Sequence, residues 1–131
     1  MIVDASALVA IVFQEPESDR FAERIATAVR ARIAAPTLLE AAIVVERSER
    51  PQEWRALDRL VAALGLDVEP FTNDHTEIAR DAYRRYGKGQ GHPAQLDFGD
   101  CISYALAKAT GEPLLYKGDD FAHTDIRSAL E

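Results

Sequence analysis

Short apolar segments of strand length alternate with longer segments of helical periodicity along the 131-residue chain. Strands that are separated by helices pair in parallel, because each return to the same edge of the sheet needs a long crossover connection, usually a helix. A parallel sheet is normally covered by helices on both faces. The pattern therefore predicts one domain over residues 1–131, a three-layer α/β/α sandwich with a mostly parallel sheet of four to five strands.

The expected boundaries follow from the apolar spacing and from the turn residues between segments. We expect strands at 1–3, 33–35, 66–71 and 114–116, and a short fifth strand that includes Ile126. We expect helices at 6–13, 17–32, 37–49, 51–64, 72–86 and 97–110, with a glycine-rich loop at 87–95. The second and fourth helices are amphipathic, and their apolar stripes are expected to include Val29 and Trp54.

The bulk composition is that of an ordinary globular protein, with 47% hydrophobic and 28% charged residues. A single cysteine, Cys101, excludes an internal disulfide and is expected to be a small buried apolar side chain. Residues 1–13 are apolar but contain Asp4 and lack a basic leader, so they predict neither a signal peptide nor a membrane span. We therefore expect a soluble cytoplasmic protein without a membrane partner.

Acidic residues stand at positions where a predicted strand meets a helix, namely Asp4, Glu40, Asp100 and the pair Asp119 and Asp120. In an open α/β sheet, functional groups gather outside the carboxyl ends of the strands. Carboxylates brought together there raise one another's pKa, and a hard divalent cation such as Mg²⁺ relieves that repulsion. The pattern predicts a metal-dependent active site.

Each acid also has a purely structural interpretation. Asp4 suits the N-cap of a helix, and Thr37 with Glu40 fits the spacing of a capping box. Asp97 is a good N-cap for the last helix, which leaves Asp100 in its first turn as the preferred ligand. The adjacent acids after the last strand can be ordinary loop residues. The cluster as a whole is the stronger signal, because its members are expected at equivalent strand ends.

Four segments together resemble a known family. They are I-V-D-A-S-A-L at 2–8, Glu40 on the helix after Pro36, G-D-C-I-S-Y-A-L-A-K at 99–108 and L-L-Y-K-G-D-D-F at 114–121. Over essentially its full length the chain resembles the PIN-domain ribonucleases of the VapC toxin type. The resemblance implies a small parallel α/β/α sandwich, RNA cleavage dependent on Mg²⁺ or Mn²⁺, and a partner antitoxin of the VapB type.

The resemblance also implies roles for individual residues. Asp4, Glu40 and Asp100 match the family's three most dependable acids, and Ser6 matches its small hydroxyl residue. Asp4 and Asp100 would be the primary metal ligands, and Glu40 would either bind the metal or orient water. A metal-activated water would then hydrolyse the phosphodiester bond, a mode of catalysis known for divalent cations.

The fourth acid of the family departs from its usual position. Many members place an Asp three residues before the Phe of the last motif, where this chain has Gly118. The role would pass to Asp119 or Asp120, and the sequence leaves both open.

A net charge of −7 is unusual for a protein that binds RNA, although bound cations reverse the sign locally. Basic candidates for RNA contact are Arg84, Arg85 and Lys88, beside Tyr83, together with Lys117. Arginine and lysine bind phosphates while aromatic rings stack on unpaired bases. The alternative is a solvated helix end whose cations complement the helix dipole.

Two other functions remain open from the residues. A metal-dependent phosphatase or other phosphoryl-transfer enzyme also gathers acids at strand ends, but phosphatases of the haloacid dehalogenase type need a second Asp where this chain has Ser6. A non-catalytic binding domain would use the acids only as helix caps. For a protein of the toxin type, the two amphipathic helices are implied surfaces for homodimerisation and antitoxin docking.

Overall fold

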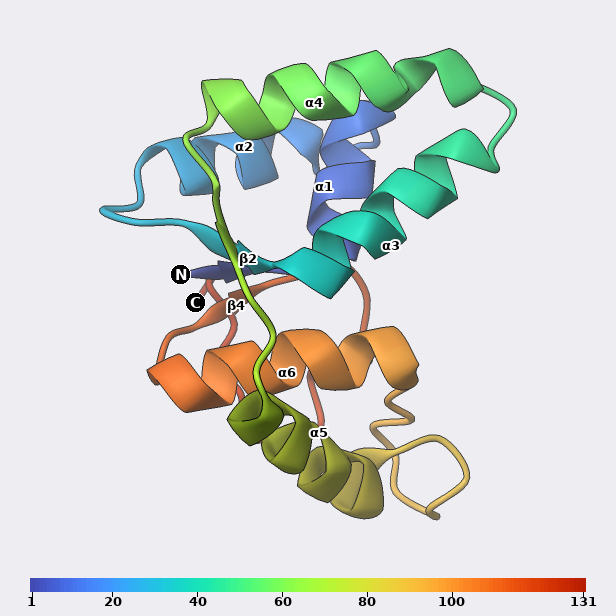
Figure 1. Ribbon diagram of the computed structural model, residues 1–131, viewed down its shortest axis with the longest axis vertical. Helices are drawn as coiled ribbons and strands as arrows, with labels where there is room; N and C mark the ends of the chain where they lie inside the picture. The colour runs from blue at the N-terminus through green and yellow to red at the C-terminus, as the bar shows by residue number, and fades with distance from the viewer.

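The computed structural model describes residues 1–131, in which a four-stranded parallel sheet lies between two layers of helices (Figure 1). The strands are β1 (Ile2–Val3), β2 (Arg32–Ala34), β3 (Asp67–Glu69) and β4 (Leu114–Leu115). The α-helices are α1 (Ala5–Val12), α2 (Ser18–Ala26), α3 (Ala35–Glu46), α4 (Trp54–Ala63), α5 (Asn73–Tyr86) and α6 (Phe98–Thr110), and a 3-10 turn, η1 (Pro51–Glu53), precedes α4. The expected three-layer α/β/α sandwich is confirmed.

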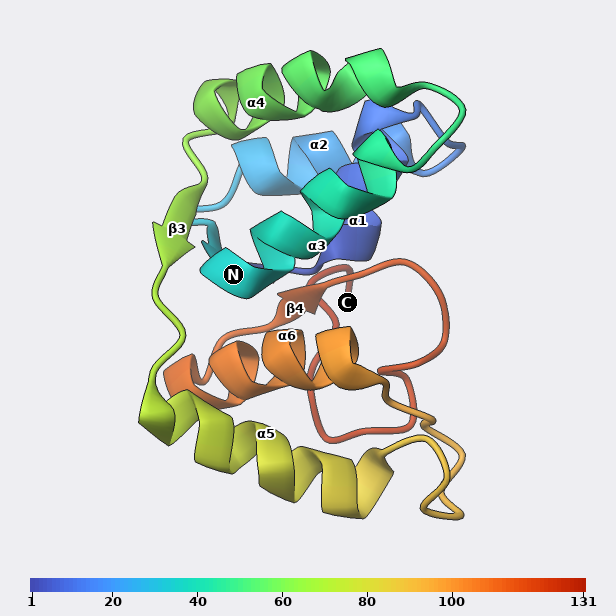
Figure 2. The same cartoon turned by 45° about the vertical axis from the view of Figure 1, so that its right-hand side comes forward.

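Helices α1 to α4 cover one face of the sheet, and α5 and α6 cover the other (Figures 1 and 2). Neighbouring strand residues point to opposite faces, so Val3 and Leu115 belong to the first core while Ile2 and Leu114 belong to the second. All four side chains are fully buried. β1 and β4 are apolar throughout because both of their faces are covered, whereas the edge strand β3 (Asp67–Glu69) is polar and largely exposed.

The expected fifth strand at Ile126 is wrong. The chain end pairs with β4 only through an isolated bridge between Leu114 and Ser128. Leu114 donates its N–H to the Arg127 carbonyl at 2.9 Å and accepts from Ala129 N at 2.9 Å. Pairing stops there because β4 itself has only two residues, so the sheet keeps four strands.

The apolar stripes of the amphipathic helices α2 and α4 are buried at their centres and exposed at one end. Phe21, Ile25 and Leu57 are each 2% exposed and belong to the first core. Val29 and Trp54, which the periodicity places on the buried stripes, are exposed instead. Val29 follows the end of α2, where the chain turns toward β2, and Trp54 opens α4 at the rim of the layer.

Four of the exposed large apolar side chains lie on α3 and at the start of α6. Leu39, Ile43 and Val44 of α3 are exposed, and Phe98 of α6 is 82% exposed. None of the helices is long and apolar enough to cross a lipid bilayer.

All four strands are parallel, but the order in which the chain adds them to the sheet, β3-β2-β1-β4, reverses once, between β1 and β4. From β1 the chain builds outward through β2 to β3, then returns to place β4 on the other side of β1. Ligands of open α/β sheets bind outside the carboxyl ends of the strands at such a switch point. Asp4 follows β1 directly and therefore lies at this position.

Candidate active site

Asp4 is held at both of its carboxylate oxygens although it is only 5% exposed. Oδ2 accepts hydrogen bonds from the Ser6 N–H at 3.1 Å and from Ser6 Oγ at 2.6 Å. Oδ1 accepts from Ser103 Oγ on α6 at 2.5 Å. Asp4 does cap α1, as its structural interpretation predicts. The same contacts fix its orientation at the end of β1.

Glu40 does not belong to a capping box, so that interpretation of Thr37 and Glu40 is wrong. Helix α3 begins at Ala35, with Pro36 in its first turn and no side chain capping its start. Thr37 is consequently inside the helix, where its buried hydroxyl lies 3.5 Å from Ser103 Oγ. The Glu40 carboxylate is free of any cap, and it lies against the backbone of Gly99.

Asp97 and Asp100 form a reciprocal pair at the start of α6. Asp100 N donates to Asp97 Oδ1 at 2.8 Å, and Asp97 N donates to Asp100 Oδ2 at 3.0 Å. Asp97 is therefore the N-cap that the sequence predicts. Only Oδ2 of Asp100 accepts the hydrogen bond from Asp97, so Oδ1 of Asp100 takes no part in the cap.

The structure brings Asp4, Glu40 and Asp100 together around one cavity of about 380 Å³. They come from the end of β1, from α3 and from α6, and thus from both helical layers. Ser6, Glu15 and Lys117 also line this acidic cavity. Residues separated by nearly a hundred positions in the sequence therefore share one pocket at the switch point of the sheet.

Glu40 and Asp100 resist ionisation. Burial raises the pKa of Glu40 to about 7, and the negative charges of Asp4 and Asp97 add to the shift. Burial also raises the pKa of Asp100 to about 8, reinforced by the charges of Asp97, Asp4 and Asp120 and opposed by the Asp97 backbone N–H. Crowded carboxylates without a counter-charge show this behaviour.

Asp120 lies within the electrostatic reach of the cluster, although neither it nor Asp119 lines the acidic cavity. Partial burial raises the pKa of Asp120, and the charges of Asp97 and Asp4 raise it further. Asp120 in turn acts on Asp100, whereas Asp119 does not act on Asp100 or Glu40. These charge interactions favour Asp120 over Asp119 as the fourth acid.

Lys117 is the one cation that lines the acidic cavity, but it does not neutralise the three acids. Its Nζ pairs with Glu15 Oε2 at 3.2 Å and with Glu17 Oε2 at 3.5 Å. Hydrogen bonding to Glu15 accordingly raises the pKa of Lys117. The Lys117 backbone N–H donates to Ser6 Oγ at 3.0 Å, which ties the segment after β4 to the start of α1.

The remaining basic candidates lie away from the acidic cavity. Arg84 and Arg85 stand in the last turn of α5, and each approaches Asp81, at 3.6 and 3.9 Å. Arg85 also lies over the ring of Tyr86 and donates to its hydroxyl at 2.9 Å. Lys88 is exposed in the loop that follows.

The donor set fits a hard divalent cation that keeps part of its water shell. All the candidate ligands are carboxylates, the ligand type that Mg²⁺ and Mn²⁺ prefer. No three acidic, histidine or cysteine side chains are close enough together to hold an ion by themselves. Mg²⁺ is commonly bound through one or two carboxylates plus water. The residues present are compatible with that mode of binding.

Two positions that shape the site were not predicted from the sequence. Ser103 donates to Asp4, and Gly99 accommodates the Glu40 carboxylate. A signal for Ser103 was present, because it lies one helical turn after Gly99 and Asp100 as a hydroxyl within an apolar run. Gly99 carries no signal of its own, since its role depends on a residue of another helix.

Fold and site together define an α/β domain with an acidic, cation-compatible pocket at the switch point of a parallel sheet. Residues 1–127 match the family model of the PIN domain. Ribonuclease VapC42 of Mycobacterium tuberculosis is 48% identical over 129 residues, covering 98% of each chain. Ribonuclease VapC28 of the same organism is 46% identical over 131 residues, covering all of this chain and 98% of its own. The chain belongs to the PIN-domain family, in its group of VapC ribonucleases.

Solved structures support the same fold. VapC20 of Mycobacterium tuberculosis, described as a toxin that cleaves the sarcin-ricin loop, superposes with a TM-score of 0.77 at 17% identity over 95% of both chains. A chain of VapBC2 from Rickettsia felis, bound to a DNA fragment from its promoter, superposes with a TM-score of 0.75 at 14% identity. That match covers 97% of this chain and 94% of the Rickettsia chain.

Proposed function

We propose that this protein is a metal-dependent endoribonuclease that acts as the toxin of a toxin–antitoxin pair. The main observation in support of this proposal is that Asp4, Glu40 and Asp100 line one cavity in which no cation neutralises them. Helix capping accounts for Asp4 and Asp100 but leaves Glu40, which caps nothing, without a role. The ribonuclease names of relatives that are 42–48% identical support the choice of RNA as substrate.

Mg²⁺ or Mn²⁺, when bound, supplies Lewis acidity toward the phosphate and lowers the pKa of water. Asp4 and Asp100 are the proposed ligands. Ser6 and Ser103 hold the Asp4 carboxylate in a single orientation. The ligand is therefore preorganised, and no conformational entropy is lost when it binds the metal. Glu40 either binds the metal or orients the attacking water, and Asp120 adds negative charge that acts on Asp100.

The proposed partner is an antitoxin of the VapB type. One structural neighbour is a toxin–antitoxin complex from Klebsiella pneumoniae, with a TM-score of 0.68 and 19% identity over 95% of this chain and 92% of that chain. The Rickettsia neighbour is a VapBC assembly. We propose that this protein is also paired with an antitoxin and forms a homodimer. The exposed apolar side chains of α3 suit protein contacts better than the covered stripes of α2 and α4 do.

The test is cleavage of purified cellular RNA in the presence of Mg²⁺ or Mn²⁺, with the new 5′ ends mapped by sequencing. Asp4→Asn and Asp100→Asn should abolish cleavage while the circular dichroism spectrum stays native. Asp58→Asn is the matched control, because Asp58 is an exposed acid of α4 outside the acidic cavity. Full cleavage by both site variants, or cleavage that persists in excess EDTA, would contradict the proposal.

A further inference from the structure

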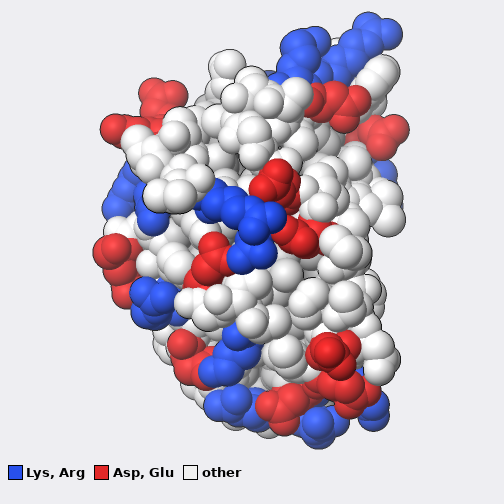
Figure 3. Space-filling model, turned by 60° about the vertical axis from the view of Figure 1, so that its left-hand side comes forward, with Lys and Arg blue, Asp and Glu red and all other residues white.

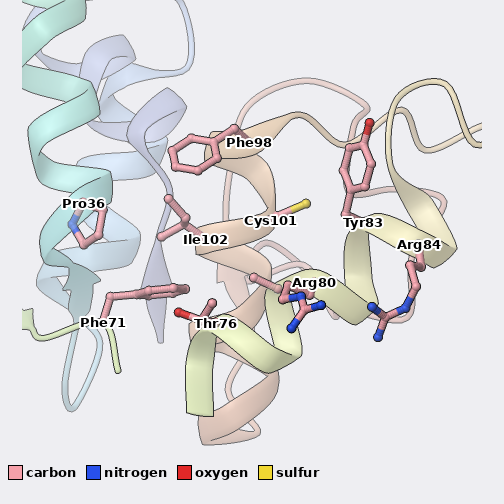
Figure 4. A pocket seen from close by; sticks show the side chains of 10 residues that line it. Pro36, Phe71, Thr76, Arg80, Tyr83, Arg84, Phe98, Cys101 and Ile102 are labelled. Atoms are coloured by element: carbon pink, nitrogen blue, oxygen red, sulfur yellow. The ribbon is translucent and has the colours of Figure 1, made fainter. Parts of the chain in front are cut away.

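A second cavity, of about 600 Å³, is lined by residues of α5 and of α6, together with Pro36 and Phe71. Its volume is within the range of roughly 300–1,000 Å³ that is usual for pockets that bind small ligands. Phe71 and Phe98 flank one end, near Pro36, while Tyr83 and Arg84 stand at the other end with Arg80 between them (Figure 4). We call it the aromatic pocket.

The aromatic pocket adjoins the acidic cavity through shared helices. Phe98 lies between Asp97 and Asp100 in the first turn of α6. Pro36 lies one turn before Glu40 on α3. Pro36, Glu40 and Phe98 line one apolar hollow that shares residues with both cavities, so a chain molecule bound at the carboxylates can extend toward the aromatic pocket.

The electrostatics of the aromatic pocket are opposite to those of the chain as a whole. The protein carries a net charge of −7, yet no acidic residue lines this pocket and two arginines do. Arg80 and Arg84 are one turn apart and so share a face of α5. A mixed charge distribution over one face of the molecule is visible in Figure 3, and the lining of the aromatic pocket contrasts with it.

Both arginines are available to a ligand. Arg80 approaches Glu77 at 3.2 Å and Arg84 approaches Asp81 at 3.6 Å, with every side chain of these pairs more than half exposed. Exposed pairs of this kind are weak. Guanidinium groups bind phosphate through paired hydrogen bonds, so a phosphate can replace these carboxylate partners.

We propose that the aromatic pocket binds the base and phosphate of an RNA nucleotide adjacent to the cleaved bond. Phe98 is 82% exposed and takes little part in the protein's own core, which leaves its ring free to stack on an unpaired base. Arg80 and Arg84 bind the phosphate of that nucleotide. The choice of RNA over an acidic peptide rests on the proposed function, since the pocket adjoins the site assigned to RNA cleavage.

This assignment divides the basic residues of α5 and its following loop into two groups. Arg84 lines the aromatic pocket, whereas Arg85 and Lys88 do not. Arg85 is instead engaged with Tyr86 on its own helix. Arg85→Ala is consequently the matched control for Arg84, because it removes an adjacent cation of the same kind without changing the pocket.

The experiment measures binding of a short, unstructured, fluorescein-labelled RNA by anisotropy, so that its result does not depend on cleavage. Phe98→Ala should weaken binding roughly 5- to 150-fold, the range found when a stacking aromatic is removed. Replacing both Arg80 and Arg84 by Ala should reduce the slope of log affinity against log salt by about 0.7 for each lost phosphate contact. Arg85→Ala should change neither quantity.

A series of RNAs with one abasic position moved along the strand tests stacking directly. One position should weaken binding to the wild type and have no effect in Phe98→Ala, because the two changes remove the same contact. Absence of such coupling would overturn the proposal. Phe98 is exposed, so its replacement leaves the fold intact, and thermal unfolding checks this.

A synthetic peptide with Glu and Leu at helical spacing serves as a second probe. Pocket-dependent binding of the peptide, with RNA binding unchanged in Phe98→Ala and in the double arginine variant, would overturn the nucleotide assignment in favour of a protein ligand. Failure of the wild type to cleave any RNA would contradict the proposed function, while the binding measurements would still decide the occupant of the aromatic pocket.

Discussion

The carboxylate of Glu40 on α3 lies against the backbone of Gly99 on α6, so closely that a Cβ atom at position 99 would stand 2.7 Å from Glu40 Cδ. This contact joins helices that belong to opposite layers of the sandwich. It also lies beside Asp100, so the spacing between two of the three acids depends on the absence of a side chain at position 99.

Gly99→Ala should therefore impair cleavage without harming the fold. The Glu40 side chain is flexible at its end and can move away from the new methyl group, but it then leaves its place in the acidic cavity. Alanine is favoured over glycine within a helix by about 1 kcal/mol, so stability should be kept or increased. RNA cleavage should fall by about tenfold or more, which corresponds to about 1.4 kcal/mol of lost transition-state stabilisation.

Cleavage rates and thermal unfolding of the same Gly99→Ala preparation check this prediction. An unchanged rate would mean that the position of the Glu40 carboxylate does not matter for catalysis. A large loss of stability would mean that the two helices, rather than the side chain, yield to the methyl group.

Ser103→Ala should affect both stability and activity, because Asp4 Oδ1 loses the donor that lies 2.5 Å away. A buried acceptor left without its partner costs about 1–3 kcal/mol. Thr37→Val is the matched control, since it removes a neighbouring hydroxyl whose contact with Ser103 is 3.5 Å long and weaker. Urea unfolding of both variants should show the larger loss for Ser103→Ala. Equal losses would contradict the special role of the hydrogen bond to Asp4.

The two adjacent acids after β4 should differ in importance. Asp120 is coupled to Asp4, Asp97 and Asp100, whereas Asp119 does not act on Asp100 or Glu40. Asp120→Asn should slow cleavage about tenfold or more, and Asp119→Asn should leave the rate nearly unchanged. The measurement is the initial cleavage rate of both variants at the same saturating Mn²⁺ concentration. The reverse order would make Asp119 the fourth acid.

Much of the architecture is predictable because local pattern and global fold agree in this chain. Apolar runs at Ile2–Val3 and Leu114–Leu115 are buried on both faces, as parallel strands require. The errors occur at the ends of elements. Val29 fits the helical period of α2, but the chain has already turned toward β2 at that position. Ile126 is apolar, but a two-residue β4 offers no further pairing.

The acidic residues were predictable one by one, whereas their supporting contacts were not. Strand ends place Asp4, and the first turn of a helix places Asp100, through rules that act within a few residues. The contact of Gly99 with Glu40 and the hydrogen bond from Ser103 to Asp4 join residues that are far apart in the sequence. Such pairs depend on how the two helical layers meet at the sheet, which a single sequence does not reveal.

The metal-free protein should lose stability as the pH rises from about 5 to 8. In the folded state, burial raises the pKa of Glu40 from 4.5 to about 7 and that of Asp100 from 3.8 to about 8. Between these limits the folded state binds more protons than the unfolded state, so the stability contributed by the protonated acids is lost with increasing pH. Thermal unfolding in EDTA across this range measures the slope. Asp100→Asn should reduce this slope to the part that Glu40 contributes and should raise the melting temperature at pH 8, because the amide carries no charge to bury. Mg²⁺ should restore the stability of the wild type at pH 8 by binding the ionised carboxylates, and it should stabilise Asp100→Asn much less.

Asp58→Asn is the control and should behave as the wild type does in both the pH series and the Mg²⁺ series. A wild-type melting temperature that is independent of pH in EDTA, or that responds equally to Mg²⁺ in Asp100→Asn, would show that these carboxylates are neither crowded nor able to bind the cation.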